Sequence, residues 1–195
     1  MQRGRASTVT DLGDGTVLRT GGDPQREAVL MGLAAEHGLR VPRVEQVRHD
    51  GLVLERIDGP TMAKRLVRRP WQAHVQVAIL ASLHERLHRV PLDGGSLLHL
   101  DLHPENVMLS PAGPVLIDWT NARSGRAEED VALTWLIMET SGGLPGRVLA
   151  RMFAGRAGTE TIRRGLGAAR EFRLADPNVT DAEGTRVRRA RIHDG

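Results

Sequence analysis

The spacing of apolar residues changes near residue 60, and this change limits the folds open to the chain. Before it, short segments of alternating character are separated by turn sequences such as Asp14-Gly15 and Asp50-Gly51. These dipeptides are typical of tight β-hairpins. After Asp58-Gly59-Pro60, apolar residues recur every three or four positions, as on one face of a helix. The sequence therefore predicts an α+β fold in which a sheet-rich lobe, residues 1–58, precedes a mainly helical lobe, residues 59–195.

The first lobe is predicted to hold a small antiparallel sheet and one helix. Asp23 can cap that helix, Pro24 suits its first turn, and Gly38 ends it. Two strands are expected before the helix and two after it. Their predicted ranges are 8–10, 16–19, 41–47 and 51–57.

The second lobe is predicted to begin with one long core helix over residues 71–90, whose apolar positions include Trp71 and Val75. Strands are expected at 107–109 and 115–117, and further helices at 128–138, 147–153 and 160–172. The basic segment 186–191 is expected to be frayed or to lie on the surface. Because ligands often bind between lobes, we expect the site near the junction at residues 55–60.

Composition excludes several kinds of site. The chain has 195 residues and no cysteine, which excludes disulfides, zinc–thiolate centres and a thiol nucleophile, and which fits a reducing compartment. No run of 18 apolar residues occurs, and the first 15 residues lack the apolar region of a secretion signal. We therefore expect a cytoplasmic protein without a membrane partner.

The charge balance gives little reason to expect a nucleic-acid partner. Lys and Arg number 27 against 24 Asp and Glu, so the formal net charge is only +3. Proteins that bind a phosphate backbone through a basic patch normally have a larger excess of Lys and Arg over Asp and Glu. Self-association is left open by the sequence.

The segment His99-Leu100-Asp101-Leu102-His103-Pro104-Glu105-Asn106 carries the strongest chemical signal. Asp101 is followed five residues later by Asn106, which is the spacing of the kinase catalytic loop. Twelve residues further on, Asp118 follows an apolar strand, and the turn between them allows a hairpin to bring Asn106 and Asp118 together. Phosphoryl transfer needs a base near the acceptor hydroxyl and oxygen ligands for Mg²⁺. The pattern therefore predicts that Asn106 and Asp118 share one metal ion close to Asp101.

The sequences HLDLHPENVML and VLIDW resemble the catalytic and metal-binding motifs of the aminoglycoside phosphotransferase family, whose fold is similar to that of protein kinases. The resemblance implies that ATP is the donor and a small-molecule hydroxyl is the acceptor. It also implies that Asp101 accepts the proton of that hydroxyl and that Asn106 and Asp118 hold Mg²⁺. His103 and Trp119 fit the small-molecule branch better than the protein kinases. The identity of the acceptor is left open.

The same resemblance extends to the first lobe with weaker motifs. Arg19 stands where the family has a lysine that contacts the nucleotide phosphates, and Glu27 matches its acidic partner. Backbone groups near Glu55 and Ile57 are expected to meet adenine, and Gly4 belongs to the expected nucleotide-covering loop. Arginine at position 19 departs from the family and puts efficient catalysis in doubt more than nucleotide binding. Because residue 4 already lies in this loop, we expect either a shortened first strand or a natural start further upstream.

Three other interpretations compete with an active kinase. A nucleotide-binding pseudokinase would suit Arg19, and the Arg19–Glu27 pair could instead be a simple surface ion pair. The sequence His84-Glu85-Arg86-Leu87-His88 matches the H-E-x-x-H zinc motif of metallohydrolases, but Glu105 is the only third ligand that stands out.

Two histidines and one aspartate in or near the catalytic loop have other expected roles. His99 is expected to support the backbone of the loop, whereas His103 is expected either to contact substrate or to pack. Asp130 is expected to cap or brace its own helix, and the family resemblance also implies a structural aspartate there.

Overall fold

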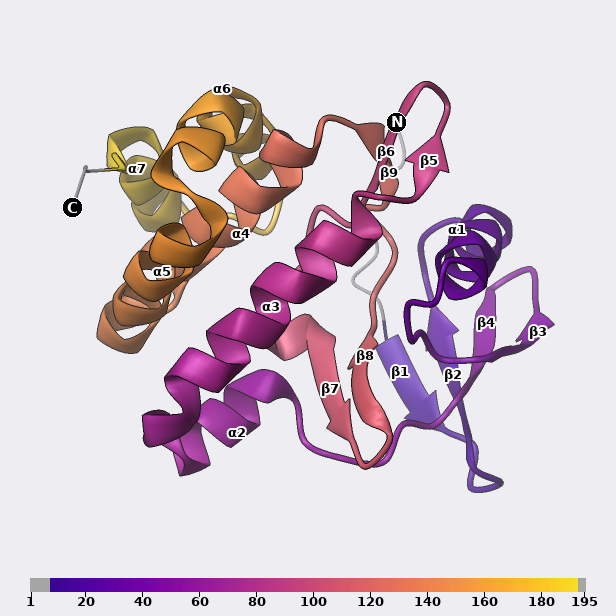
Figure 1. Cartoon of the computed structure of the whole chain (residues 1–195). Coiled ribbons are helices and arrows are strands. Elements are labelled where there is room, and N and C mark those ends of the chain that lie inside the picture. Colours follow the sequence, from indigo (N-terminus) through magenta and orange to yellow (C-terminus); the bar gives the residue numbers. More distant parts are fainter. Residues whose placement is uncertain (1–7, 193–195) are drawn as a thin grey trace.

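The computed structural model describes residues 8–192, and its sheet lobe and helical lobe lie side by side (Figure 1). The sheet lobe has four antiparallel strands in the order β1-β2-β4-β3, with one helix, α1. The elements are β1 Thr8–Asp11, β2 Thr16–Thr20, α1 Pro24–Glu36, β3 Val44–Val47 and β4 Gly51–Glu55. The prediction of an α+β fold with a small antiparallel sheet lobe is therefore confirmed.

Helix α1 begins and ends where the sequence predicts. The side chain of Asp23 accepts a hydrogen bond from the Arg26 amide, Pro24 occupies the first turn, and Gly38 follows the helix with a positive φ of 80°. The buried positions recur at three- or four-residue steps, and they are Glu27, Leu30, Met31 and Ala34. One charged side chain, Glu27, is thus carried into the core of the sheet lobe.

The helical lobe contains most of the helices together with two small sheets. Its elements are α2 Met62–Arg68, a 3₁₀ turn η1 Pro70–Gln72, α3 Ala73–Leu87, β5 Pro91–Leu92, β6 Gly95–Leu98, a 3₁₀ turn η2 Pro104–Asn106, β7 Val107–Ser110, β8 Gly113–Leu116, β9 Arg123–Gly125, α4 Ala127–Ser141, α5 Gly143–Ala157, α6 Thr159–Ala175 and α7 Asp181–Arg189. Strands β7 and β8 form a hairpin, and β5, β6 and β9 form a separate small sheet.

Helix α4 is the centre of the helical lobe. Almost all of its residues from Asp130 to Met138 are buried, and it packs against both α5 and α6. The approach of α6 depends on Gly165, because a Cβ at this position would lie 1.8 Å from the carbonyl oxygen of Glu128. A residue without a side chain is therefore required where the two helices cross.

The structure differs from the sequence prediction at two places in the helical lobe. Trp71 was expected in the core helix, but it lies in η1 before that helix begins and its exposed fraction is 70%. The basic segment 186–191, expected to be frayed or to lie on the surface, mostly belongs to helix α7, which Thr180 caps. It is therefore not frayed, but its arginine residues are exposed. Val187 is fully buried there, and the Arg186 guanidinium donates to the carbonyl oxygen of Thr140 at 2.7 Å. Buried Val187 and Ala190, the Thr180 cap and the ion pair between Arg173 and Glu183 hold this basic helix in place. Its overall polarity hides these contacts in the sequence.

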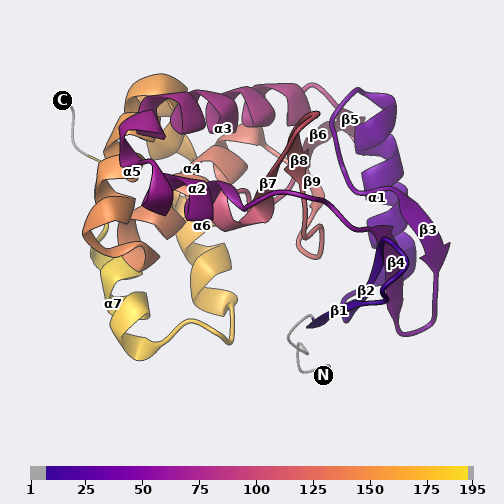
Figure 2. The ribbon, with the colours of Figure 1, turned by 90° about the horizontal axis from the view of Figure 1, so that it is seen from below.

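The segment between the lobes, residues 56–61, runs along the β7–β8 hairpin before α2 begins (Figure 2). The Leu109 amide donates to the carbonyl oxygen of Pro60 at 2.9 Å, and Thr61 pairs with Met108. Gly59 has a φ of 140°, and a Cβ on it would lie 2.3 Å from the Leu109 carbonyl oxygen. The second half of this interlobe segment is therefore fixed to strand β7. In residues 8–192, no helix combines the length and the apolar character needed to cross a membrane.

Candidate active site

The loop that contains Asp101 is held in place by Asp130 of helix α4. The Asp130 carboxylate accepts hydrogen bonds from the amides of His99, at 3.0 Å, and Leu100, at 2.8 Å. Leu100 has a positive φ of 59°, which only such anchoring stabilises in a residue with a branched side chain. Asp130 is fully buried. It braces the catalytic loop and not only its own helix, which agrees with the structural role expected from the family resemblance.

His99 links the same loop to the strand that precedes Asp118. Its Nε2 lies 3.0 Å from the Ile117 carbonyl oxygen, and its ring packs edge-on against Trp119 with 5.1 Å between the ring centroids. Burial lowers the pKa of His99, so the ring is neutral at physiological pH. The supporting role expected for His99 therefore fits its contacts.

Asp101 is oriented by two side chains of its own loop. Nδ2 of Asn106 donates to Oδ2 of Asp101 at 2.8 Å, and Nε2 of His103 lies 3.2 Å from Oδ1. Burial by itself would raise the pKa of Asp101, but the contacts with His103 and Asn106 outweigh it and hold the pKa below its usual value. The carboxylate is therefore ionised at neutral pH, and His103 contacts Asp101 directly.

The β7–β8 hairpin brings Asn106 and Asp118 to one cavity. The Ile117 amide donates to the Asn106 carbonyl oxygen at 3.0 Å, directly beyond the pairing of Val107 with Leu116. Asp118 leaves the strand with a φ of 61°, which turns its side chain out of the hairpin. Both side chains line a cavity of about 240 Å³ between the lobes. The hairpin therefore places Asn106 and Asp118 at the same cavity.

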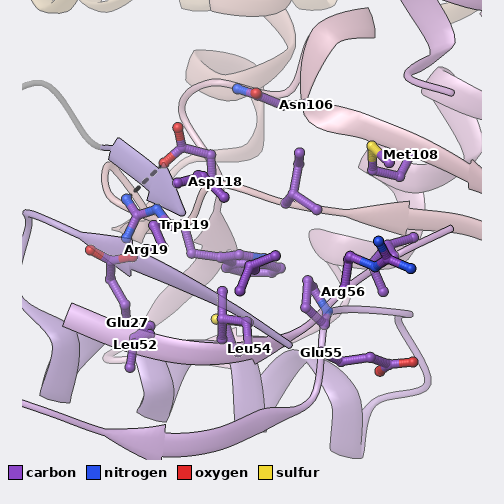
Figure 3. Close-up of a pocket in the computed structure, with 16 residues that line it drawn as sticks. Arg19, Glu27, Leu52, Leu54, Glu55, Arg56, Asn106, Met108, Asp118 and Trp119 are labelled. Carbon is purple, nitrogen blue, oxygen red and sulfur yellow. Dashed lines mark hydrogen bonds and ion pairs between the residues drawn. The ribbon is translucent and has the colours of Figure 1, made fainter. Parts of the chain in front are cut away.

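Arg19 lines this cavity and lies between Glu27 and Asp118 (Figure 3). Its Nη1 lies 2.6 Å from Oε2 of Glu27, and its Nη2 lies 2.9 Å from Oδ1 of Asp118. The side chains of Arg19 and Glu27 are only 6% and 3% exposed, so the interpretation as a surface ion pair is wrong. Burial raises the pKa of Glu27 to about 7, even though Arg19 acts in the opposite direction.

Thr120 is a member of this cluster that the sequence did not single out. Its hydroxyl donates to Oδ1 of Asp118 at 2.7 Å and also contacts Nη2 of Arg19. A threonine two residues after an aspartate commonly forms such a contact, so the Asp118-Trp119-Thr120 sequence contained a local signal. The contact from Arg19 had no such signal, because it depends on how the two lobes meet.

Some of the other residues predicted to bind the nucleotide line the cavity. Glu55 and Ile57 both line it, together with an apolar wall formed by Val17, Met31, Leu52, Leu54, Met108 and Trp119. Gly4 lies outside the described residues. Asp101 and His103 are not among the lining residues, but the bond from Asn106 to Asp101 places the carboxylate at the edge of the cavity.

The zinc-hydrolase interpretation is not supported by the surroundings of its motif. His84 is buried and Glu85 points to solvent, so the general base of such an enzyme is not beside the histidines. Glu105, the third ligand suggested by the sequence, contacts Thr61 instead. The carboxylate that does lie next to His84 and His88 is Asp130, at 3.7 and 3.0 Å.

Among the solved structures with a similar fold are a choline/ethanolamine kinase family protein, an ethanolamine kinase and an aminoglycoside phosphotransferase. A choline/ethanolamine kinase family protein from Mesorhizobium loti is 18% identical with a TM-score of 0.58, covering 96% of this chain and 84% of that one. Plasmodium vivax ethanolamine kinase is 10% identical with a TM-score of 0.55, covering 94% and 81%. The ADP-bound aminoglycoside phosphotransferase APH(2'')-Ib is 10% identical with a TM-score of 0.57, covering 96% and 90%. At these identities the likeness shows the kinase-like fold alone.

Sequence comparison assigns the family. No curated protein matches this chain. The sequence model of the phosphotransferase enzyme family, APH, matches residues 4–172, a range that includes the catalytic loop, the Asp118 strand and Arg19. This range is most of the chain, and it carries the motifs whose side chains meet in the cavity. The protein therefore belongs to the APH family of phosphotransferases.

Proposed function

We propose that the protein transfers the γ-phosphate of ATP to a hydroxyl group of a small molecule. One observation carries the proposal: Asn106 and Asp118 line the same cavity between the lobes, and Asn106 also holds the Asp101 carboxylate. Two similar structures support the choice of nucleotide, since one is described as ADP-bound and another as a ternary complex with streptomycin and ATP. We further propose that residues 1–58 and 59–195 form the two lobes of a single kinase-like unit.

Asp101 is assigned the role of the base that orients and deprotonates the acceptor hydroxyl. Its pKa is held below the usual value, so it is present as the carboxylate at neutral pH. A carboxylate of low basicity contributes mainly by aligning the hydroxyl and by accepting its proton late in the transfer. His103 and Asn106 fix the orientation of this carboxylate.

Asn106 and Asp118 fit a magnesium ion by the chemistry of their donor atoms. Nδ2 of Asn106 is used on Asp101, so its carbonyl oxygen Oδ1 is the atom that can face a cation. Oδ1 of Asp118 is paired with Arg19, and Oδ2 is the second oxygen of that carboxylate. Mg²⁺ prefers such oxygen ligands and would neutralise charge on the phosphates when bound.

Arg19 is assigned to the nucleotide phosphates, with Glu27 as the group that positions it. Glu27 holds Nη1, which leaves the Nη2 side of the guanidinium facing Asp118 and the cavity. Above it, the apolar wall suits an adenine ring, with backbone groups of Glu55 and Ile57 at its edge. The Glu55 amide already donates to the Arg43 carbonyl oxygen at 2.9 Å, so the Glu55 carbonyl and the Ile57 amide are the groups proposed to meet adenine.

The test is Mg²⁺-dependent consumption of ATP in the presence of a panel of hydroxylated acceptors, including aminoglycosides, choline-like amino alcohols, sugars and nucleosides. We expect turnover with at least one acceptor and a loss of about 10²–10⁴-fold in Asp101→Asn. Asp50→Asn, in the turn between β3 and β4, is the matched control and should leave turnover unchanged. Turnover that is equal in wild type and Asp101→Asn would contradict the assignment of the base.

A nucleotide-binding pseudokinase is the second candidate, and the Arg19–Asp118 ion pair favours it. In this state the guanidinium holds one oxygen of the proposed metal ligand at 2.9 Å. Thermal stabilisation by ATP without turnover of any acceptor would identify this alternative.

A further inference from the structure

A group of metal-ligating side chains lies in the core of the helical lobe, outside the cavity just described. His84 and His88 are one turn apart on α3, and Asp130 projects from α4. One ligand atom from each residue lies within 4.8 Å of the other two. The exposed fractions of the three side chains are 3%, 10% and 0%. This cluster has no part in the phosphotransferase site, apart from the two hydrogen bonds that Asp130 accepts from the catalytic loop.

The hydrogen bonds of Thr134 determine which nitrogen of His84 carries its proton. The Thr134 hydroxyl donates to the Leu102 carbonyl oxygen at 2.7 Å, so its oxygen must accept the bond from Nε2 of His84 at 3.0 Å. Nε2 of His84 is therefore protonated and Nδ1 carries a lone pair. Within residues 8–192, this buried Nδ1 has no hydrogen-bond partner.

The Nδ1 lone pair of His84 faces a negative charge. Oδ2 of Asp130 lies 3.7 Å from it, which is beyond hydrogen-bond distance. Two lone-pair-bearing atoms that face each other in a buried place repel, and a cation between them removes the repulsion. His88 completes the arrangement, because its Nε2 lies 3.0 Å from the same Oδ2.

We propose that His84 Nδ1, His88 Nε2 and Asp130 Oδ2 bind a zinc ion that braces the catalytic loop. Tetrahedral zinc with bonds of about 2.0–2.2 Å places neighbouring ligand atoms roughly 3.3 Å apart. The distances of 3.7 and 3.0 Å to Oδ2 lie on either side of this value. Zinc replaces the proton on Nε2 of His88, and the proton of that ring moves to Nδ1. A water molecule supplies the fourth ligand at the side of His88, the member of the cluster with the most exposure.

The groups around the three side chains orient them as the surroundings of metal ligands usually do. Ligating histidines usually donate their second ring nitrogen to an oxygen that fixes the ring, as His84 does to Thr134. The carboxylate is fixed in the same way by the amides of His99 and Leu100. Glu85 points to solvent, so no base stands beside the ion for hydrolysis. The ion is thus assigned to holding α3, α4 and the start of the catalytic loop together.

The test uses the full-length chain without a histidine tag, stripped with a chelator and titrated with Co²⁺ and then Zn²⁺. We expect one equivalent of Co²⁺ to produce the intense visible absorption of a tetrahedral site, and one equivalent of Zn²⁺ to abolish it. Zinc should also raise the thermal midpoint of the stripped protein. Failure of the wild-type protein to bind one equivalent, or only the weak absorption of octahedral Co²⁺, would overturn the proposal.

Three variants assign the ligands. His84→Gln should lose the tetrahedral spectrum, and Thr134→Val should weaken zinc binding by about 10–100-fold because it removes the bond that orients His84. His49→Gln is the matched control, since the His49 side chain is 92% exposed, and it should bind zinc like wild type. If His84→Gln does not fold, His88→Gln takes its place. Retention of the tetrahedral spectrum in the folded ligand variant would also overturn the proposal. These measurements record binding alone, so they do not depend on turnover.

Discussion

The ion pair between Arg19 and Glu27 leads to a quantitative prediction because both side chains are almost completely buried. Their exposed fractions are 6% and 3%, and the two charged atoms are 2.6 Å apart. Removal of one partner from such a pair leaves the other charge unpaired in the interior, which costs about 3–5 kcal/mol. We therefore predict that Arg19→Met lowers the free energy of unfolding by about this amount, and that Glu27→Gln lowers it by less, because Arg19 keeps its ion pair with Asp118. The double variant should lose less than the sum of the two.

The double-mutant cycle separates the pair from the other contacts of Arg19, including its bond to Asp118. Urea unfolding of the four proteins, followed by circular dichroism at pH 8, should give a coupling energy of about 2–3 kcal/mol. The matched control is the cycle of Arg43 with Glu45, whose charged atoms are also 2.6 Å apart but whose side chains are 73% and 35% exposed. That cycle should give about 0.2–1 kcal/mol. Equal coupling energies in the two cycles would refute the argument from burial.

The pH chosen for this cycle follows from the pKa of Glu27, which burial raises to about 7. A carboxyl group whose pKa is higher in the folded than in the unfolded state stabilises the folded state at pH values below the unfolded pKa. This contribution is lost as the pH rises from about 4.5 to 7. At pH 8 Glu27 is ionised and its attraction to Arg19 is complete. The coupling energy should therefore be smaller at pH 6 than at pH 8.

Three further predictions concern other parts of the chain. Gly165→Ala should lower the free energy of unfolding by about 1–3 kcal/mol, because the new Cβ would meet the Glu128 carbonyl oxygen. Gly167→Ala on the same helix is the control: a Cβ there has nothing within 4 Å, so the free energy of unfolding should rise by about 0.5–1 kcal/mol. Burial lowers the pKa of His84 to about 3, so below pH 6.5 this residue takes up a proton in the unfolded state but not in the folded state. As the pH falls from 6.5 to 5, the metal-free protein should therefore lose about 2 kcal/mol of stability relative to His84→Gln, measured by urea unfolding at each pH. Asp118→Asn should raise the Mg²⁺ concentration for half-maximal turnover by about tenfold or more, because a hydrogen bond or ligand contact to a charged group contributes about 1.5–3 kcal/mol.

The features that could be predicted from the sequence are those with a local cause. The Asp-Gly turns specify the two hairpins of the sheet lobe, and Asp23 with Pro24 specifies the start of α1. The five-residue spacing of Asp101 and Asn106 likewise reflects one loop, and the return of Asp118 reflects one hairpin. In each case the interacting residues are close in the sequence, so the order of residue types is enough to predict their arrangement.

The features that could not be predicted depend on contacts between distant segments. The bond from Arg19 to Asp118 joins residues 99 positions apart and exists only because the lobes meet at a particular angle. Asp130 was assigned to its own helix or to a structural role, but its partners are the loop 30 residues earlier and two histidines of α3. Trp71 obeys the helical spacing and nevertheless lies at the surface, because the helix begins two residues later.

The interlobe segment is attached to both lobes within a few residues. Pro60 and Thr61 are bonded to Leu109 and Met108, and Gly59 fits against the same strand without room for a side chain. On the other side, the Arg56 amide donates to the carbonyl oxygen of Gly15 in the sheet lobe, which leaves residues 57–58 between the two attachments. A nucleotide that meets the Ile57 amide would contact the chain at this short connection, so occupancy of the adenine position would be linked to the relative position of the lobes.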